Sequence, residues 1–340
     1  MDRILVVLPN WYGETLFATP FLKALRAQRP KAFLATLGWP QCREVLKHSP
    51  LIDECLDYDE HGAHQHFEDK WRLARALRAQ RFDTAFLLRK SFSRSLLLCL
   101  ARIPMRIGLA NPKSGWLLTH TVIPSTVPTH KAFTYLPLLE AVGLTEVRSA
   151  YEYTVSDKER ESAAAWRKAQ SPNGRPLVIL HPGANWPHKR WPAERFAALG
   201  DRLIEHHDVH VVITGGPGDL EMAKRLASQM HHPAVVCTGQ TTLRQLAAQL
   251  EQSQLVVSND TGVLHIAAAL GRSLVALYGP TSPVLTGPLG DPRRMVVIHH
   301  PECCPAIPCY QPETPPHAGM SAITVEEVFE RAEELLPTYV

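Results

Sequence analysis

The chain has 340 residues, of which 45% are hydrophobic and 20% are charged, and its net charge is +3. This length favours two domains over one, and the hydrophobic content is sufficient for well-packed cores. The net charge is too small to indicate nucleic acid, and no basic run with interleaved aromatic residues is present, so we expect no nucleic-acid partner.

Cysteine usage and the N-terminus indicate the compartment. Seven cysteines occur without the regular spacing of a disulfide framework, and residues 1–3 lead directly into a strand pattern rather than a signal peptide. We therefore expect a reducing, cytoplasmic location. No apolar run approaches the roughly 20 residues that span a bilayer, so any membrane contact should be peripheral.

The chain alternates strand and helix patterns, which is typical of parallel α/β sheets. Strands are predicted at residues 4–8, 33–37, 52–56, 84–88, 106–109, 177–180, 209–214, 234–236, 255–258 and 274–278. Helices are predicted at residues 16–29, 67–80, 93–102 and 130–142, from starts near 192, 218, 241 and 262, and at 324–336. Two α/β halves of this kind predict a bilobal, doubly wound architecture with a ligand crevice outside the carboxyl ends of the strands.

The polar segment at residues 150–175 marks the predicted domain boundary. We expect an N-terminal Rossmann-like domain at residues 1–155 and a second one at residues 172–322. Residues 323–340 form a C-terminal helix that is expected to pack back on the N-terminal domain, and residues 301–319 look irregular.

Residues 256–270 read as a strand, a polar turn and a helix that opens with small residues. The unpaired amides and the dipole at such a helix start favour phosphate. Asp260 and Thr261, just before Gly262, could either cap the helix or touch a ligand. His265 could be an ordinary buried histidine or a ligand-binding one. The next strand runs into residues 279–283, so a second loop points toward the same crevice.

Two further loops follow strands of the second half. In residues 181–192, Gly183 precedes Lys189 and Arg190, whose charges could neutralise a pyrophosphate, although a solvated basic turn would look the same. In residues 214–219, Gly215 allows close approach of the backbone to a ligand, which is a weak signal by itself.

The first strand ends in a loop that carries Glu14 into the first helix. A carboxylate at this position could act as a general base, or it could simply be an acid favoured by the helix dipole. No G-x-G-x-x-G follows the strand, which argues against an ordinary dinucleotide dehydrogenase.

Residues 84–139 contain no Asp or Glu but several cations, among them Arg89, Lys90 and Arg94. This asymmetry suits an anionic acceptor such as a phosphorylated or carboxylated lipid head group, and a solvated basic face is the alternative. A D-x-D at residues 57–59 could hold a divalent cation on a nucleotide sugar, but it reads as a surface loop. Cys303, Cys304 and Cys309, with His299 and His300 just before them, could bind metal, but they lack a C-x-x-C pair, so we expect ordinary reduced thiols and no metal site.

The loops at residues 9–14 and 181–192 and the run at residues 256–283 resemble, in order and over nearly the whole chain, the ADP-heptose:lipopolysaccharide heptosyltransferases of glycosyltransferase family 9. The Trp-Tyr-Gly and Lys-Arg-Trp-Pro runs look more like the heptosyltransferase II branch than the heptosyltransferase I branch.

The resemblance implies a GT-B fold with two domains facing a central cleft, inverting transfer from ADP-heptose to an anionic lipid A-core acceptor, no metal or other cofactor, and peripheral contact with the inner membrane. By position, the implied donor-binding residues are Gly183, Lys189, Arg190, Gly215, Asp260, Thr261, Gly262 and His265. Arg89, Lys90 and Arg94 are expected to bind the acceptor. Glu14 stands where the family commonly has an Asp acting as the base.

Other functions share this fold. A GT-B-like sugar epimerase would release free sugar without an acceptor, and a nucleotide-sugar-binding protein would bind the donor without transferring it. A different heptose acceptor, including a protein, is a third alternative.

Overall fold

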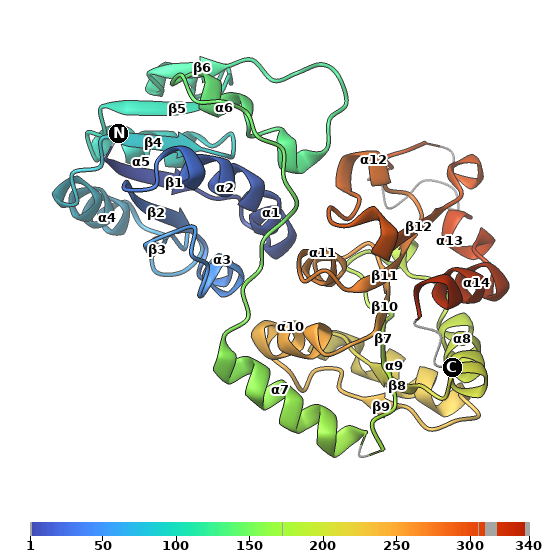
Figure 1. Ribbon diagram of the computed structural model, residues 1–340. Helices are drawn as coiled ribbons and strands as arrows, with labels where there is room; N and C mark the ends of the chain where they lie inside the picture. Colours follow the sequence, from blue (N-terminus) through green and yellow to red (C-terminus); the bar gives the residue numbers. More distant parts are fainter. Residues whose placement is uncertain (1, 172, 305, 310–317, 337–340) are drawn as a thin grey trace. The chain divides into compact units, whose positions relative to one another are not determined.

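The computed structural model describes residues 2–171, 173–304, 306–309 and 318–336, and the chain divides into two compact units (Figure 1). Unit 1 covers Met1–Thr154 and unit 2 covers Val155–Val340. The boundary lies in the polar segment that the sequence indicated. Helix α7 (Asp157–Gln170), which follows the boundary, belongs to unit 2.

Each unit is built on one six-stranded sheet in which every pair of neighbours is parallel. The strands of unit 1, in sheet order, are β3 (Glu54–Asp57), β2 (Phe33–Gly38), β1 (Arg3–Val7), β4 (Thr84–Leu87), β5 (Met105–Leu109) and β6 (His120–Val122). The strands of unit 2, in sheet order, are β12 (Met295–His299), β11 (Ser273–Tyr278), β10 (Leu255–Asn259), β7 (Leu177–His181), β8 (His210–Ile213) and β9 (Val235–Val236).

Helices connect the strands and cover the sheets. In unit 1 they are α1 (Tyr12–Phe17), α2 (Thr19–Gln28), α3 (Pro40–Leu46), α4 (Phe67–Ala79), α5 (Phe92–Leu100) and α6 (Pro137–Glu140). In unit 2, α7 is followed by α8 (Ala193–His207), α9 (Leu220–Gln229), α10 (Leu243–Glu251), α11 (Gly262–Ala269), α12 (Pro283–Thr286), α13 (Gly319–Ala322) and α14 (Val325–Leu335). Among the described residues, none of the helices has the length and apolar character required to cross a membrane.

The strand order creates one topological switch point in each sheet. In unit 1 the order reverses between β1 and β4, and in unit 2 it reverses between β7 and β10. At such a point the loops that leave two neighbouring strands diverge to opposite faces of the sheet and leave a crevice for a ligand. Val7 pairs with Leu87 and His181 pairs with Ser258, so in each unit two strand-end loops begin side by side.

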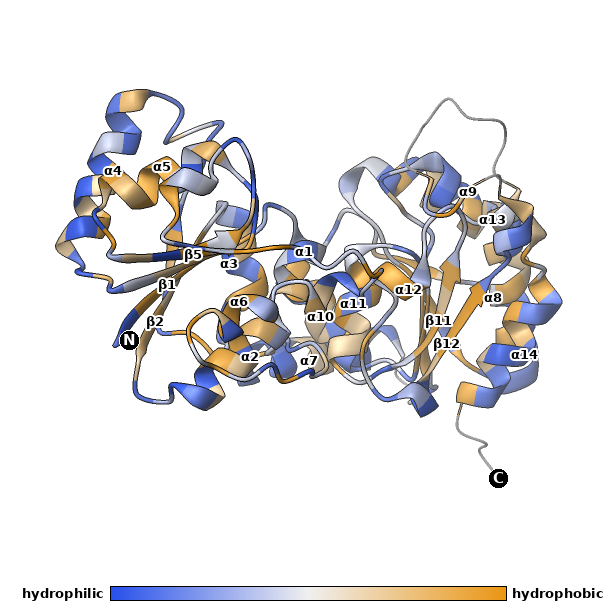
Figure 2. Cartoon of the chain, turned by 90° about the horizontal axis from the view of Figure 1, so that it is seen from above, coloured by the Kyte–Doolittle hydropathy of each residue, from blue (hydrophilic) through white to orange (hydrophobic). Residues whose placement is uncertain are grey.

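The strands are apolar on both sides because helices cover both faces of each sheet. Along β1, Ile4 and Val6 enter the core cluster that includes α2, whereas Leu5 and Val7 enter the cluster that includes α4 and α5. In Figure 2 the strands β11 and β12 carry mostly hydrophobic residues, while α4 and α14 alternate between the two kinds. This amphipathic pattern is what a helix at the surface of a sheet requires.

The structure corrects two predicted helices. The helix expected at 16–29 is two helices, α1 and α2, which meet at Ala18. Pro20 lies in the first turn of α2, where its missing N–H does no harm, and the Thr19 hydroxyl donates to the Leu16 carbonyl at the break. The helix expected at 130–142 is reduced to a 3₁₀ turn and the short α6, which begins at Pro137. The short elements α3, β6 and β12 were not predicted.

The C-terminal helix packs within unit 2. The structure puts α14 in unit 2, where Val328, Phe329 and Ala332 enter the core cluster formed with β10, β11 and α8. Trp191 adds to this packing, because its indole N–H donates to the Ile323 carbonyl just before α14. The helix therefore covers the sheet of unit 2.

Candidate functional site

The loops that follow β7 and β10 are fastened together by one buried amide. Asn259, the last residue of β10, has no exposed surface. Its Nδ2 donates to the Pro182 carbonyl at 2.8 Å, and its Oδ1 accepts from the Trp191 N–H at 3.1 Å. Both partners belong to the loop after β7, so the two loops of the switch point in unit 2 hold a fixed relation to each other.

The next residue, Asp260, gathers three loops around one carboxylate. Its Oδ2 accepts from the Lys189 ammonium at 2.6 Å and from the Thr281 hydroxyl at 2.7 Å. Burial by itself would raise the pKa of Asp260, but the Lys189 and His265 charges and these two hydrogen bonds hold the pKa below its ordinary value. Asp260 is therefore a carboxylate at neutral pH, and it orients the Lys189 ammonium, whose side chain is 20% exposed.

Helix α11 starts directly after this cluster. Thr261 is its N-cap residue, with extended backbone and no capping hydrogen bond from its side chain, and Gly262 begins the helix. The first amides of an α-helix have no partner within the helix and attract anions. His265 lies one turn further on, is 3% exposed, and has its Nε2 3.9 Å from the Asp260 Oδ1.

Two glycines allow Asp219 to approach the loop after β7. A Cβ at Gly183 would lie 2.5 Å from the Asp219 Oδ2, and one at Gly215 would lie 2.9 Å from the Thr238 methyl group and 3.0 Å from the Asp219 Cβ. Arg190 donates to the Ala184 carbonyl at 2.9 Å and lies 3.7 Å from the Asp219 carboxylate. Gly183, Gly215 and Arg190, three predicted donor residues, thus join the loops after β7 and β8.

His181 ends β7 beneath these loops. Its Nδ1 lies 3.0 Å from the Thr214 hydroxyl, the corresponding residue after β8. Burial lowers the pKa of His181 to about 4, and the nearby Asp219 opposes this only in part. The imidazole is therefore neutral at pH 7 and acts as a packed, hydrogen-bonding wall of the site.

In unit 1, Glu14 lies in the first turn of α1 and is half-buried. Burial, with the Glu14 charge as the smaller cause, raises the pKa of the Tyr135 hydroxyl well above the usual range, while Arg89 acts in the opposite direction. Glu14, Arg89 and Tyr135 therefore lie in one electrostatic neighbourhood. The ends of β1 and β4 bring this about, because Glu14 follows β1 and Arg89 follows β4.

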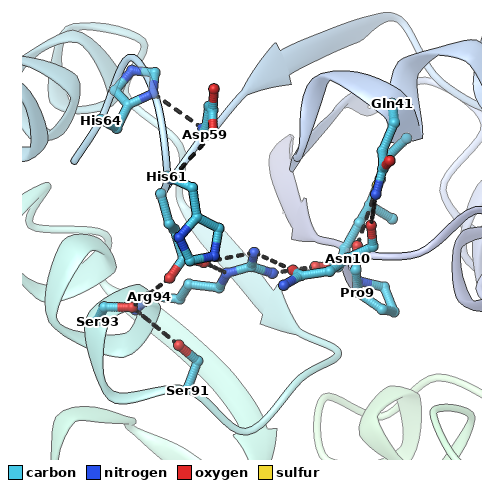
Figure 3. A network of polar contacts seen from close by, with 12 residues as sticks. Pro9, Asn10, Gln41, Asp59, His61, His64, Ser91, Ser93 and Arg94 are labelled. Atoms are coloured by element: carbon cyan, nitrogen blue, oxygen red, sulfur yellow. Dashed lines mark hydrogen bonds and ion pairs between the residues drawn. The ribbon is translucent and has the colours of Figure 1, made fainter.

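The three predicted acceptor-binding cations fall into two groups. Arg89 and Lys90 are exposed in the loop after β4. Arg94 is only 1% exposed, and its guanidinium donates to the Leu8 carbonyl, the Asn10 side chain and Glu60 (Figure 3). Its hydrogen bonds thus go to protein groups that follow β1 and β3.

Thr281 and Asn259 were not chosen from the sequence. Thr281 belongs to the loop after β11, which was expected to point at the same crevice, so the signal was a polar residue following a third strand end. In the D-x-D, Asp57 pairs with Arg43 and Asp59 accepts from the amides of its own turn. In the described part of the chain, no group of three His, Cys, Asp or Glu residues is arranged to hold a metal ion.

Comparisons with known proteins agree with this geometry. A family model described as glycosyltransferase family 9 (heptosyltransferase) matches residues 70–313. Lipopolysaccharide heptosyltransferase 2 of Salmonella typhimurium is 31% identical over 310 residues, which cover 86% of this chain and 87% of that protein.

Two solved structures are similar over 98% of this chain. A glycosyl transferase family 9 protein of Veillonella parvula has a TM-score of 0.86 with 27% identity and 97% of its chain covered. The ADP-heptose lipopolysaccharide heptosyltransferase II of Escherichia coli has a TM-score of 0.82 with 27% identity and 98% covered. The family match and the two parallel sheets lead to one conclusion: the chain belongs to glycosyltransferase family 9, the heptosyltransferases, and is a glycosyltransferase of the GT-B fold.

Proposed function

We propose that this enzyme moves heptose from ADP-heptose to the inner core of lipopolysaccharide, on an acceptor of the heptosyl-Kdo-lipid A type, with inversion at the anomeric carbon. The observation that carries the proposal is the cluster of Lys189, Asp260 and Thr281, which brings three strand-end loops of unit 2 to the start of α11. The names of the relatives, lipopolysaccharide heptosyltransferase 2 and ADP-heptose lipopolysaccharide heptosyltransferase II, support the choice of sugar and acceptor.

Unit 2 supplies the donor side of the reaction. The Lys189 ammonium is partly exposed and held by Asp260, so it can meet a diphosphate without a large loss of side-chain freedom. The amides at Thr261 and Gly262 add the positive end of the α11 dipole. As the bond between the anomeric carbon and the phosphate oxygen breaks, these groups stabilise the negative charge that develops on ADP.

Unit 1 supplies the base. We propose that Glu14 accepts the proton of an acceptor hydroxyl. The hydroxyl oxygen forms the new bond to the anomeric carbon, and ADP leaves with the electrons of the broken bond between that carbon and the phosphate oxygen. A base at the end of a strand, in the first turn of a helix, has a fixed backbone and a short side chain with which to reach the hydroxyl. Arg89 and Lys90, exposed after the neighbouring strand, are placed to bind the phosphate and carboxylate groups of the acceptor.

Peripheral contact with the inner membrane is part of the proposal. Trp116, Ile123 and Val127 are 73%, 83% and 68% exposed near the edge strand β6 of unit 1. They lie in the stretch that contains no Asp or Glu, with Lys113 exposed beside Trp116. Exposed aromatic and aliphatic groups with adjacent cations suit an anionic lipid surface. Sedimentation with anionic vesicles should fall in a Trp116→Ser/Ile123→Ser variant, and unchanged sedimentation would rule these residues out.

The proposed reaction is tested by incubating the purified protein with ADP-heptose and a panel of truncated core acceptors, with products read by mass. Wild-type protein should add one heptose to an inner-core acceptor and release ADP. The Glu14→Gln variant should bind ADP-heptose as wild type does and lose at least about a hundredfold in turnover, the size of a general-base contribution. Free heptose without acceptor would indicate epimerase-type chemistry, and donor binding without any product would indicate a binding protein; either result overturns the proposal.

A further inference from the structure

Arg94 is an arginine whose burial calls for a structural or functional reason. It lies in the first turn of α5, where its backbone N–H is capped by Ser91, and it is 1% exposed. Burial lowers its pKa, and the Glu60 carboxylate, 2.8 Å from the guanidinium, works against that shift. Taking a guanidinium out of water costs several kcal/mol unless its donors are paired. The hydrogen-bond partners of Arg94 therefore indicate which groups it positions.

Those partners lie on the path to Glu14. Nη1 donates to the carbonyl of Leu8, the first residue after β1, and Nη2 donates to Oδ1 of Asn10, both at 2.5 Å. Nε donates to Glu60 at 2.9 Å on the other side (Figure 3). Asn10 is itself only 6% exposed. The Arg94 guanidinium thus holds the chain between β1 and α1 at Leu8 and Asn10, and Asn10 is only four residues before Glu14. We call the hydrogen bonds of Arg94 to Leu8, Asn10 and Glu60 the Arg94 clamp.

Other elements fix the same turn. Gln41 on α3 donates to the Asn10 carbonyl (Figure 3). The Cys42 thiol, also on α3, donates to the Pro9 carbonyl at 3.3 Å. The loop is therefore held by α3 on one side and by the Arg94 guanidinium of α5 on the other. Charge-assisted hydrogen bonds are the stronger part of this arrangement.

From this geometry we infer that Arg94 is a positioning residue for Glu14, acting through Leu8 and Asn10, with Glu60 as its counter-ion. The inference rests on the proposed function, because it assigns Arg94 a share in the step that Glu14 performs. It also replaces the expectation that Arg94 binds the acceptor, since its hydrogen bonds go to buried protein groups. A shift of about an ångström in a reacting group can cost a hundredfold in rate, so the position of the loop governs turnover.

The test is a comparison of kcat and acceptor KM in variants of the full chain. Arg94→Ala and Asn10→Ala should each lower kcat by about 10- to 100-fold with little change in acceptor KM. Guanidinium ion at low millimolar concentration should restore part of the kcat of Arg94→Ala and none of Asn10→Ala. Arg78→Ala, which removes an exposed arginine of α4, is the matched control and should behave as wild type.

A double variant separates positioning from a general loss of structure. If Arg94 acts through the base, Arg94→Ala should add almost nothing to the kcat loss of Glu14→Gln. If the kcat loss of the double variant equalled the product of the two single losses, Arg94 would have a purely structural role, and the inference would be overturned. A rise in acceptor KM with kcat intact would also overturn it and would indicate that Arg94 binds the acceptor. If Arg94→Ala does not fold, the same comparison of kcat losses is made with Asn10→Ala, alone and combined with Glu14→Gln. Absence of transfer by the wild type is a separate result, which refutes the proposed function itself.

Discussion

At the scale of single residues, the proposed donor side depends on one buried carboxylate and its ammonium partner. Asp260 is 7% exposed and Lys189 is 20% exposed, and the two are separated by 71 positions in the chain. A buried pair of this kind adds little stability relative to an apolar pair, but breaking it from one side is costly. The pair therefore reports on both stability and donor binding, and the two effects can be measured apart.

Lys189→Met should lower the free energy of unfolding by about 3 kcal/mol, because it leaves the Asp260 carboxylate buried without its main counter-charge. ADP affinity should fall by about 10- to 100-fold through loss of the phosphate partner. In the double variant with Asp260→Asn, stability should largely return while ADP binding stays weak. Urea unfolding and calorimetric titration with ADP provide the two measurements, and a double variant that regained ADP affinity would contradict the role of Lys189.

His181 gives the protein a defined sensitivity to acid. Its pKa is about 4 in the fold because of burial, compared with about 6.5 when the chain is unfolded. Between these values the unfolded state binds more protons, so stability rises with pH across the window and is lost as pH falls. From pH 7 to pH 4, this side chain should lower the free energy of unfolding by about 3 kcal/mol.

A His181→Gln variant isolates this contribution, because glutamine does not titrate. Urea unfolding of both proteins at pH 7, 5 and 4 should show the variant losing about 3 kcal/mol less than wild type over that range. Equal losses in the two proteins would mean that His181 does not titrate with a depressed pKa.

At the scale of elements, glycines let the loops after β7 and β8 approach each other. Gly183 is the clearest case, since a Cβ there would lie 2.5 Å from the Asp219 Oδ2. That carboxylate also accepts from the Gly216 N–H at 3.0 Å, so displacing it disturbs the turn before α9. The glycine therefore serves packing between loops, in addition to the approach of a ligand.

Gly183→Ala should cost about 1–3 kcal/mol in stability, the usual penalty for overpacking, and should weaken ADP binding. Gly218→Ala is the matched control in the loop after β8, because a Cβ there meets nothing within 4 Å. Thermal unfolding with and without ADP compares the two variants. If Gly183→Ala unfolded at the same temperature as the control both with and without ADP, the close approach of Gly183 to Asp219 would contribute neither to stability nor to ADP binding.

At the scale of the whole molecule, each unit has its own sheet and its own apolar clusters. The polar cluster of Lys189, Asp260 and Thr281 lies entirely within unit 2, and α7 and α14 pack within that unit as well. Glu14 and the Arg94 clamp lie entirely within unit 1. The proposed donor side and the proposed base thus lie in separate units.

Residues 155–340 expressed alone should therefore fold and bind ADP within about tenfold of the full chain, a difference of about 1.4 kcal/mol. They should transfer no heptose, because the proposed base is in the other unit. Circular dichroism and calorimetric titration test the first statement and the transfer assay tests the second. A folded fragment without ADP affinity would show that donor binding needs residues of unit 1.

The sequence by itself determined the two parallel sheets, because strand and helix periodicity are local signals. Motifs that resemble those of the family also singled out Glu14, Lys189 and Asp260, whose roles in the reaction stay predictions. Only the tertiary structure decided that Lys189 and Thr281 meet on Asp260, that α14 completes unit 2, and that Arg94 is buried on Leu8 and Asn10. Burial and hydrogen-bond partners depend on residues that lie far apart in the chain. An arginine in a basic stretch therefore looks the same in sequence whether its guanidinium faces solvent or, as in Arg94, holds the backbone beside the proposed base.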